Sequence, residues 1–491
     1  MKKIFCLLLC ALMLLGLCAC GGGSGEKKED TNGLKAGFAR LDCIPDDPLV
    51  HIAGGVSADD PATDGLLDNL AVTCIALQKG EETVLIFACD IVDVTGYYKK
   101  VESSVSGVTG VPASNIFFGA THTHSAPTLK DSDSKLPGRD NYEVKYVSTA
   151  TETAQKAIAD LSPVGDLSYG SIMTEDMVRV RHYMLTDGTT YGNGHGTLSG
   201  KTIESHLYDA DEECQVIRIS RPAEDKKDIV MFNLGAHGTI VSGTHTSSLS
   251  ADFPFPARTY VEENADVHAA YFLAAAGDQV PSSRIATEVK NKKDHFAYGE
   301  QLGGYVVECL NNMTASTTDT LARYDENYVA KHMKDGIDDV DRLKKANEIT
   351  TAKSMYGASS QQVKDLCKEY GFDSHFEASG LVNRSKTPAE GHFPIGAMLL
   401  GDIGITFFPG EPFGAMGRQL KDNSPTPFTF VITCTEDDQG YFPTEIAKEH
   451  GFYEYGQTKY AMGTGEAVMD RYCEILTALK DGTEVPAQAT P

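Results

Sequence analysis

The sequence predicts an α/β protein in which mixed β-sheets are flanked by helices and form one large domain with a helical insertion. Short apolar runs rich in β-branched residues alternate with amphipathic stretches, which is typical of a mixed α/β body. No internal repeat is visible, and no Pro- or Ser-rich linker divides the 491-residue chain after residue 35. The simplest organisation is one domain over residues 36–481 with a tail at 482–491.

The individual elements follow from the length and period of the apolar runs. Strands are expected at residues 70–78, 83–91, 114–120, 228–235, 269–275, 396–408 and 427–433. Helices are expected at residues 143–161, 295–312, 338–349, 360–371 and 466–480. Between Ala322 and Pro394 the chain turns polar and helical, and the charge run at 338–345 is interpreted as a solvated face. We therefore predict a helical insertion at about residues 322–394.

The N-terminus is typical of an export signal. Lys2 and Lys3 precede an apolar core at residues 4–17, which is shorter than the roughly 20 residues that a membrane span needs. The ending Leu17-Cys18-Ala19-Cys20 resembles a bacterial lipobox, with residues 1–19 as the signal peptide and Cys20 as the acylated residue. Cys18 is the weaker candidate, because Leu17 is large for the position before the cut. Residues 20–35 would form a flexible tether, and the protein would be exported and anchored at the bacterial cell surface.

The net charge limits the classes of partner. A formal charge of -26 argues against nucleic acid or an anionic lipid surface as the main partner, because both require basic patches. The membrane association expected here comes from the lipid anchor alone.

A His-x-His pair follows the apolar run at 115–120, in the sequence Thr-His-Thr-His-Ser. If that run is a strand, side chains two residues apart point the same way, so His122 and His124 reach one site. Neutral imidazoles are the commonest metal ligands in proteins. The alternative interpretation is a polar surface turn, and this fragment alone does not decide between them.

Other segments place polar residues where apolar runs end, which is where a sheet delivers side chains to a crevice. Each has an ordinary alternative: a structural histidine, a solvated turn carboxylate or a simple turn. The candidates are His237 in Gly-Ala-His-Gly, Glu411 in Pro-Gly-Glu-Pro, Asp278 in Gly-Asp-Gln-Val-Pro-Ser-Ser, and Tyr441 in Gln-Gly-Tyr-Phe-Pro.

Together these segments resemble the catalytic domain of the neutral/alkaline (non-lysosomal) ceramidase family. The opening at 37–45 resembles its first strand, and residues 121–127 resemble its Thr-His-Thr-His-Ser-Gly-Pro element. Segments 250–254 and 408–412 also fit, so that scattered matches cover roughly residues 36–480. The chain would be a divergent lipoprotein member that lacks the family's trailing immunoglobulin-like domain.

The resemblance implies a zinc ion held by two histidines, a glutamate and a tyrosine. On this chain the implied ligands are His122, His237, Glu411 and Tyr441. It also implies that His124, Arg181 and Tyr453 line the reacting centre. Arg179 competes with Arg181, because Val180 replaces an asparagine of the family motif, and a charged strand face is the alternative for both arginines.

One departure from the family concerns the nucleophile. The family motif Gly-Asp-x-Ser-Pro has an attacking serine, and here that position is Val280. Either Ser282 or Ser283 acts from a shifted position, or a zinc-bound hydroxide attacks directly. We favour the hydroxide, because a shifted residue rarely preserves the placement that attack requires. Asp278, or Asp90 after the run at 84–89, would move the proton or orient a histidine.

The sequence therefore favours a zinc-dependent hydrolase of an amide (N-acyl) bond in a small molecule or lipid, with ceramide-like substrates as the family-implied class. The loss of the serine leaves other amides and esters open, such as N-acyl amino acids, cell-wall fragments or glycan-linked acyl groups. A second hypothesis is a non-catalytic surface lipoprotein that binds a ligand on the same fold. The retention of all four implied ligands argues against it, because buried His and Glu without a metal are costly.

Overall fold

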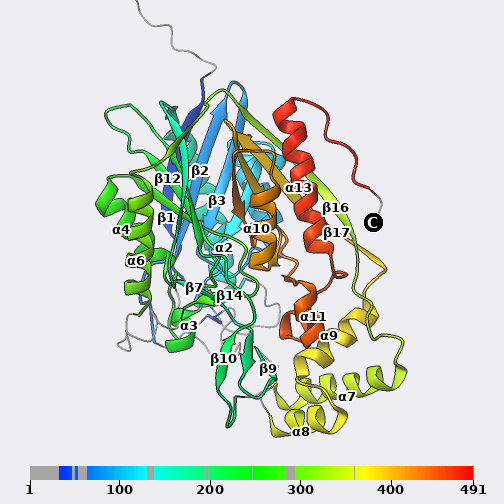
Figure 1. Cartoon of the computed structure of the whole chain (residues 1–491). Helices are drawn as coiled ribbons and strands as arrows, with labels where there is room; N and C mark the ends of the chain where they lie inside the picture. The colour runs from blue at the N-terminus through cyan, green and yellow to red at the C-terminus, as the bar shows by residue number, and fades with distance from the viewer. Residues whose placement is uncertain are drawn as a thin grey trace, which may run out of the picture. The chain divides into compact units, whose positions relative to one another are not determined.

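Three mixed β-sheets form the frame of the protein in the computed structural model (Figure 1). The structure describes residues 33–46, 50–52, 64–129, 138–192, 195–196, 198–245, 247–282, 294–358 and 360–489. Residues Gly33–Pro491 form one compact unit. The predicted signal peptide, Cys20 and all but the last three residues of the predicted tether lie outside the described residues, as does Ser283.

Each sheet combines antiparallel strands with one parallel pair. The first has the order β4-β3-β2-β1-β5, and the second has the order β13-β12-β11-β6-β15. Their bounds are β1 Lys35–Asp42, β2 Ala71–Lys79, β3 Glu82–Cys89, β4 Ile116–Ala120, β5 Ser162–Pro163, β6 Leu167–Met173, β11 Glu213–Ile219, β12 Ile229–Leu234, β13 His268–Leu273 and β15 Thr314–Ser316. The third sheet comprises β16 Leu321–Lys331, β17 Glu390–Leu400, β18 Ile403–Phe407 and β20 Phe428–Ile432.

Short strands add three small sheets near the ends of the large ones. These are β7 Val178–Val180 with β14 Gln279–Pro281, β19 Glu411–Pro412 with β21 Tyr441–Phe442, and β8 Tyr183–Leu185 with β9 Thr190–Tyr191 and β10 Ile203–His206. The helices are α1 Tyr98–Thr109, α2 Gly138–Ala159, α3 Ile240–Thr244, α4 Pro254–Ala265, α6 Asp294–Cys309, α7 Val340–Tyr356, α8 Gln361–Tyr370, α9 His375–Lys386, α10 Gly414–Asn423, α11 Glu445–His450, α12 Tyr453–Gln457 and α13 Thr464–Asp481. A short 3₁₀ turn at Ala113–Asn115 leads into β4.

The side-chain alternation of the strands divides the core. On β2, Cys74 and Ala76 pack toward α1 and α2, whereas Ile75 and Leu77 face a second cluster. That cluster draws residues from all three large sheets, so the three inner faces share one central core. Helices α4 and α6 cover the outer face of the second sheet, and α10 and α13 cover that of the third (Figure 1). The predicted fold class, mixed sheets flanked by helices, is confirmed.

Two sequence expectations differ from the structure in their boundaries. The run at 396–408 is not one strand, because Gly401 has a φ of 62° and turns the chain between antiparallel strands β17 and β18. The segment at 322–394 begins and ends in strands β16 and β17, which pair along their whole lengths. Its helical part is therefore α7–α9, which we call the helical lobe, with an apolar core of its own.

None of the helices within the described residues is both long and apolar enough to cross a membrane.

Candidate metal centre

The predicted ligands meet because parallel strands from all three sheets end at one place. His122 and His124 follow β4, His237 follows β12, and Glu411 follows β18. Each of these strands belongs to the parallel pair of its sheet. Three segments that lie far apart in the sequence thus bring donor groups to one buried point.

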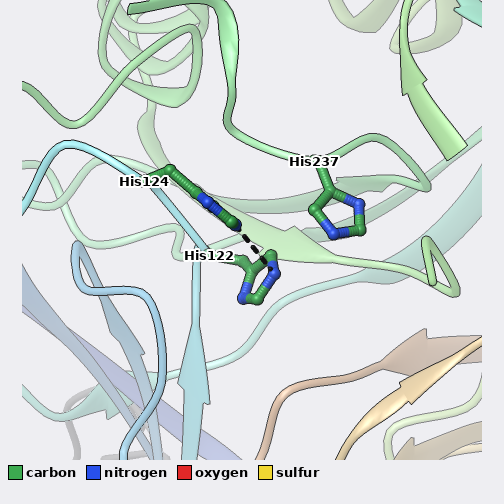
Figure 2. Close-up of side chains that lie close together, drawn as sticks. All are labelled: His122, His124 and His237. Carbon is green, nitrogen blue, oxygen red and sulfur yellow. Dashed lines mark hydrogen bonds between the residues drawn. The ribbon is translucent and has the colours of Figure 1, made fainter. Parts of the chain in front are cut away.

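The two histidines of the His-x-His pair converge, although not by strand alternation. Strand β4 ends at Ala120, and His122 has a φ of 62°, which is uncommon for a residue other than glycine. The Nε2 atoms of His122 and His124 nevertheless lie 3.3 Å apart (Figure 2). The predicted proximity holds, and its cause is a left-handed turn after the strand.

A close backbone contact joins the His122 segment to the His237 segment. Thr123 forms an isolated parallel bridge with Gly238, and His124 donates its backbone N–H to the Gly238 carbonyl at 2.9 Å. A Cβ atom on Gly238 would lie 2.9 Å from the Thr123 Cα, so a side chain there would force the two loops apart. Glycine at this position sets the spacing between the histidines.

Backbone carbonyls fix which ring nitrogens face the centre. His122 Nδ1 lies 2.6 Å from the Val92 carbonyl oxygen, and His237 Nδ1 lies 2.9 Å from that of Gln279. A carbonyl only accepts hydrogen bonds, so both Nδ1 atoms carry the proton and both Nε2 atoms present lone pairs. This orientation is the usual one for histidines that hold a metal.

The Nε2 lone pairs face a carboxylate. Glu411 Oε2 lies 3.4 Å from His122 Nε2 and 3.1 Å from His237 Nε2. Three acceptors that converge in a buried site repel one another unless a cation lies among them. Burial raises the pKa of Glu411, but protons on the Nε2 atoms of His122 and His237 would hold it well below its usual range, and a bound metal ion would take the place of those protons. The donor set therefore fits a divalent metal ion.

His124 provides a second way to complete the site. The ring nitrogens of His122, His124 and His237 lie within 4.8 Å of one another, and these three residues form a group that could hold a metal (Figure 2). His124 is partly exposed whereas the other two are buried, so it lies on the open side. Tyr441 lies directly opposite Glu411 in the β19–β21 pair, which places its backbone beside the ligands.

Arg181, Tyr441 and Tyr453 form a second cluster, in which Tyr441 contacts both of the others. The Arg181 guanidinium lies 5.5 Å from the Tyr441 ring centroid and donates to the Gly277 carbonyl at 2.8 Å. The rings of Tyr441 and Tyr453 meet edge to face at 5.6 Å. Arg179, the competitor, instead bonds to Tyr183 and the Pro281 carbonyl, so the placement favours Arg181.

A buried network behind Arg181 was not predicted. Arg181 Nε donates to Glu454 Oε1 at 2.7 Å, and Glu454 Oε2 lies 3.0 Å from His182 Nε2. His182 Nδ1 lies 2.7 Å from the Tyr208 hydroxyl. Burial opposes ionisation of Glu454, but Arg181 and His182 lower its pKa to about 2. The ionised Glu454 carboxylate therefore fixes the position of the Arg181 guanidinium.

The two proposed proton carriers have other partners. Asp90 makes a two-pronged ion pair with Arg258, at 2.8 Å for each bond, and accepts from Thr121 at 3.2 Å. Asp278 accepts the Gly414 N–H at the start of α10 at 2.8 Å, and burial raises its pKa. Thr121 directly precedes His122, so its hydrogen bond to Asp90 stabilises the loop that carries His122. Neither carboxylate is hydrogen-bonded to a histidine of the centre within the described residues.

Comparison with solved structures places this architecture among known folds. Neutral ceramidase from Pseudomonas aeruginosa matches with a TM-score of 0.69 and 15% sequence identity, over 93% of this chain and 76% of that chain. The chain has a ceramidase-like fold. A ceramidase complexed with C2 matches with the same TM-score and identity, over 93% of this chain and 77% of that one. No protein-family model and no curated protein matches the sequence.

Strand β14, where Val280 replaces the serine of the family motif, lies beside the candidate metal centre. Gln279 on β14 supplies the carbonyl that orients His237, and Val280 pairs with Arg179 of β7. Ser282 comes three residues after Gln279, about 10 Å along an extended chain. Its backbone N–H donates to the Met177 carbonyl at 2.7 Å, and the residue is buried.

Proposed function

We propose that the protein is a metal-dependent hydrolase of amide (N-acyl) bonds, with zinc as its metal. The convergence of His122 Nε2, His237 Nε2 and Glu411 Oε2 in a buried site carries this proposal. Nitrogen ligands with one carboxylate suit zinc. The ceramidase-like fold supports an amide as the bond that is cleaved.

When bound, a zinc ion would polarise the substrate carbonyl and lower the pKa of a bound water to about 7. The protein's own groups would stabilise the charge that develops on the carbonyl oxygen. Burial and the Glu411 charge raise the pKa of Tyr453 to about 12, so its hydroxyl remains a hydrogen-bond donor at neutral pH. Arg181 adds a fixed positive charge and His124 another ring N–H. Removing one such donor typically costs about 100- to 1,000-fold in rate.

Water, rather than a serine, is the nucleophile that we propose. Val280 has no nucleophilic atom, and Ser282 lies about 10 Å along the strand from the carbonyl that contacts His237. Attack requires placement to within about an ångström. The substrate would be a small-molecule or lipid N-acyl compound, and esters or acyl groups on cell-wall or glycan fragments are alternatives of the same chemistry.

The proposal is tested by metal content and turnover measured on one sample. We expect about one zinc per chain, together with hydrolysis in a panel of chromogenic amides and esters. A chelator should abolish hydrolysis, and added zinc should restore it. Turnover that persists after complete removal of metal would contradict the proposal.

The second candidate function is a non-catalytic lipoprotein that binds a ligand on the same fold. Val280 at the family's serine position is the observation that favours it. Stoichiometric zinc without turnover of any amide or ester in the panel would support this alternative.

We further propose export and lipid anchoring at Cys20, on the signal-like N-terminus and the lipobox-like ending. Cys20→Ala should move the protein out of the membrane fraction. Unchanged fractionation, and an unchanged mass in the presence and absence of lipid precursors, would contradict acylation at this residue.

A further inference from the structure

A small cavity lies beside the metal centre, between the helical lobe and α12. Its volume is about 190 Å³, and Phe376, Leu381 and Arg384 of α9 line it together with Tyr453 and Tyr455 of α12. The Tyr453 ring contacts the Tyr441 ring at 5.6 Å and the Phe376 ring at 5.0 Å. Tyr453 therefore lines this cavity and contacts Tyr441, which pairs with Glu411.

Arg384 brings a nearly buried positive charge to the cavity. Its side chain is 8% exposed, and its Nη2 atom donates to the carbonyls of Tyr455 and Gly456. No carboxylate oxygen of the described residues lies within 4.0 Å of its guanidinium, and its buried Nε has no hydrogen-bond partner there. Burial lowers the pKa of Arg384 and outweighs the opposing attraction of Tyr455, Asp335 and Glu377. A buried charge without a carboxylate partner is costly unless a ligand supplies one.

The other charged groups of the cavity already have partners. Arg342 pairs with Glu377, and Asp335 accepts from Lys448 at 3.0 Å. Asp373 accepts from His195 at 3.0 Å. The charge at this cavity that has no hydrogen-bonded carboxylate is therefore positive, and it belongs to Arg384, which Asp335 and Glu377 attract only from a distance.

We propose that this cavity is a subsite for an anionic group of the substrate, with Arg384 as the residue that recognises it. The inference rests on the proposed hydrolase function and narrows it to amides that carry a negative charge some bonds away from the scissile bond. The cavity is smaller than the 300–1,000 Å³ usual for whole ligands, so it suits a compact group such as a carboxylate or phosphate. Arginine binds a carboxylate or a phosphate through two parallel N–H donors.

The first test uses the wild-type protein with zinc bound. N-dodecanoyl-glycine, N-dodecanoyl-aminobutyrate and N-dodecanoyl-aminohexanoate are each compared with their methyl esters. We expect kcat/KM for the free acid to exceed that for the ester by about 10- to 100-fold at one spacer length, as a charged hydrogen bond allows. N-dodecanoyl-ethanolamine phosphate beside N-dodecanoyl-ethanolamine distinguishes a phosphate from a carboxylate. Equal turnover of charged and uncharged members throughout would overturn the proposal.

The second test uses Arg384→Gln with Lys386→Gln as its control, since Lys386 is an exposed cation on the same helix. Arg384→Gln should raise KM for the preferred acid by about 10-fold or more beyond any change that it causes for the neutral ester, whereas Lys386→Gln should change neither substrate. An equal fall for acid and ester would assign Arg384 a structural role only and overturn the proposal.

Failure of the hydrolase function remains distinguishable from failure of the subsite. If no amide is hydrolysed, calorimetric binding of the same acids and esters tests the cavity directly. Binding of the acid at least about 10-fold tighter than the ester would support the subsite without catalysis, and equal or absent binding would reject it.

Discussion

The two halves of the centre are held in place by different means. The ligand half, His122, His237 and Glu411, sits at strand ends, and backbone carbonyls orient its two histidines. The reacting half, Arg181 and Tyr453, depends on a chain of side chains and on α12, a helix of five residues. In the proposed function, the sheets would determine where a metal binds, and the side-chain network and the lobe would determine how the substrate is held.

This difference means that metal binding and turnover can be separated by mutation. The helical lobe reaches α12 through a close contact: a Cβ on Gly380 of α9 would lie 1.9 Å from the Gly456 carbonyl oxygen. Arg384 binds the last carbonyls of the same helix. Substitutions at Gly380 or Arg384 should therefore displace Tyr453 and leave His122, His237 and Glu411 in place.

The largest effect is expected in the ligand half. His237→Ala removes one of the Nε2 donors, so we expect the loss of bound zinc together with a fall in kcat/KM of at least about 1,000-fold. Metal analysis and turnover of the same preparation measure both. His392→Ala, at an exposed position on β17, is the matched control. Full zinc occupancy in His237→Ala would exclude this residue as a ligand.

A large effect without metal loss is expected in the reacting half. Glu454→Gln removes the charge that holds Arg181, and a displacement of about 1 Å can cost about 100-fold in kcat. Zinc content should remain at the wild-type value. Loss of metal would show that the two halves are not independent, and an unchanged kcat would show that the network has no part in positioning.

The stability of the strands that carry the ligand half should depend on pH. Glu436 accepts the Phe118 N–H of β4 at 3.0 Å, and burial raises its pKa to about 8 from an ordinary 4.5. The folded state keeps this proton to higher pH than the unfolded state does, so stability from this group falls as pH rises from about 5 to 8. Relative to Glu436→Gln, the wild-type free energy of unfolding should fall by up to about 1.4 kcal/mol per pH unit. Parallel pH profiles for the two proteins, from denaturant titrations, would contradict this assignment.

A smaller effect is expected where the lobe meets α12. Gly380→Ala should destabilise by about 1–3 kcal/mol and lower kcat several-fold at full zinc, because the new methyl group collides with the Gly456 carbonyl. Gly304→Ala in α6 is the control, since nothing lies within 4 Å of its added Cβ and helix propensity should stabilise it by about 1 kcal/mol. Thermal unfolding and turnover measure both variants. An equal gain in stability from the two would show that the lobe contact is loose.

The smallest effect is expected from Ser282→Ala, which should keep at least about a tenth of the activity if water attacks. The loss of nearly all turnover, with zinc retained, would return the nucleophile to this serine.

The sequence predicted that His122, His237 and Glu411 lie close together, but it did not predict the network behind Arg181, for a physical reason. His122, His237 and Glu411 each follow an apolar run, and sheets bring strand ends together whatever their order in the chain. Glu454 and His182 directly follow Tyr453 and Arg181, but their meeting depends on how β7 and α12 pack, which no local pattern encodes. The same limit explains residues 396–408, where apolar periodicity concealed the turn at Gly401.

If His122, His237 and Glu411 hold one divalent ion, crystals of the protein grown with zinc should show it by anomalous diffraction at the zinc edge. We expect one strong peak about 2.0–2.2 Å from His122 Nε2, His237 Nε2 and a Glu411 carboxylate oxygen. A crystal saturated with zinc that shows no peak there, or whose strongest peak lies on other residues, would contradict it.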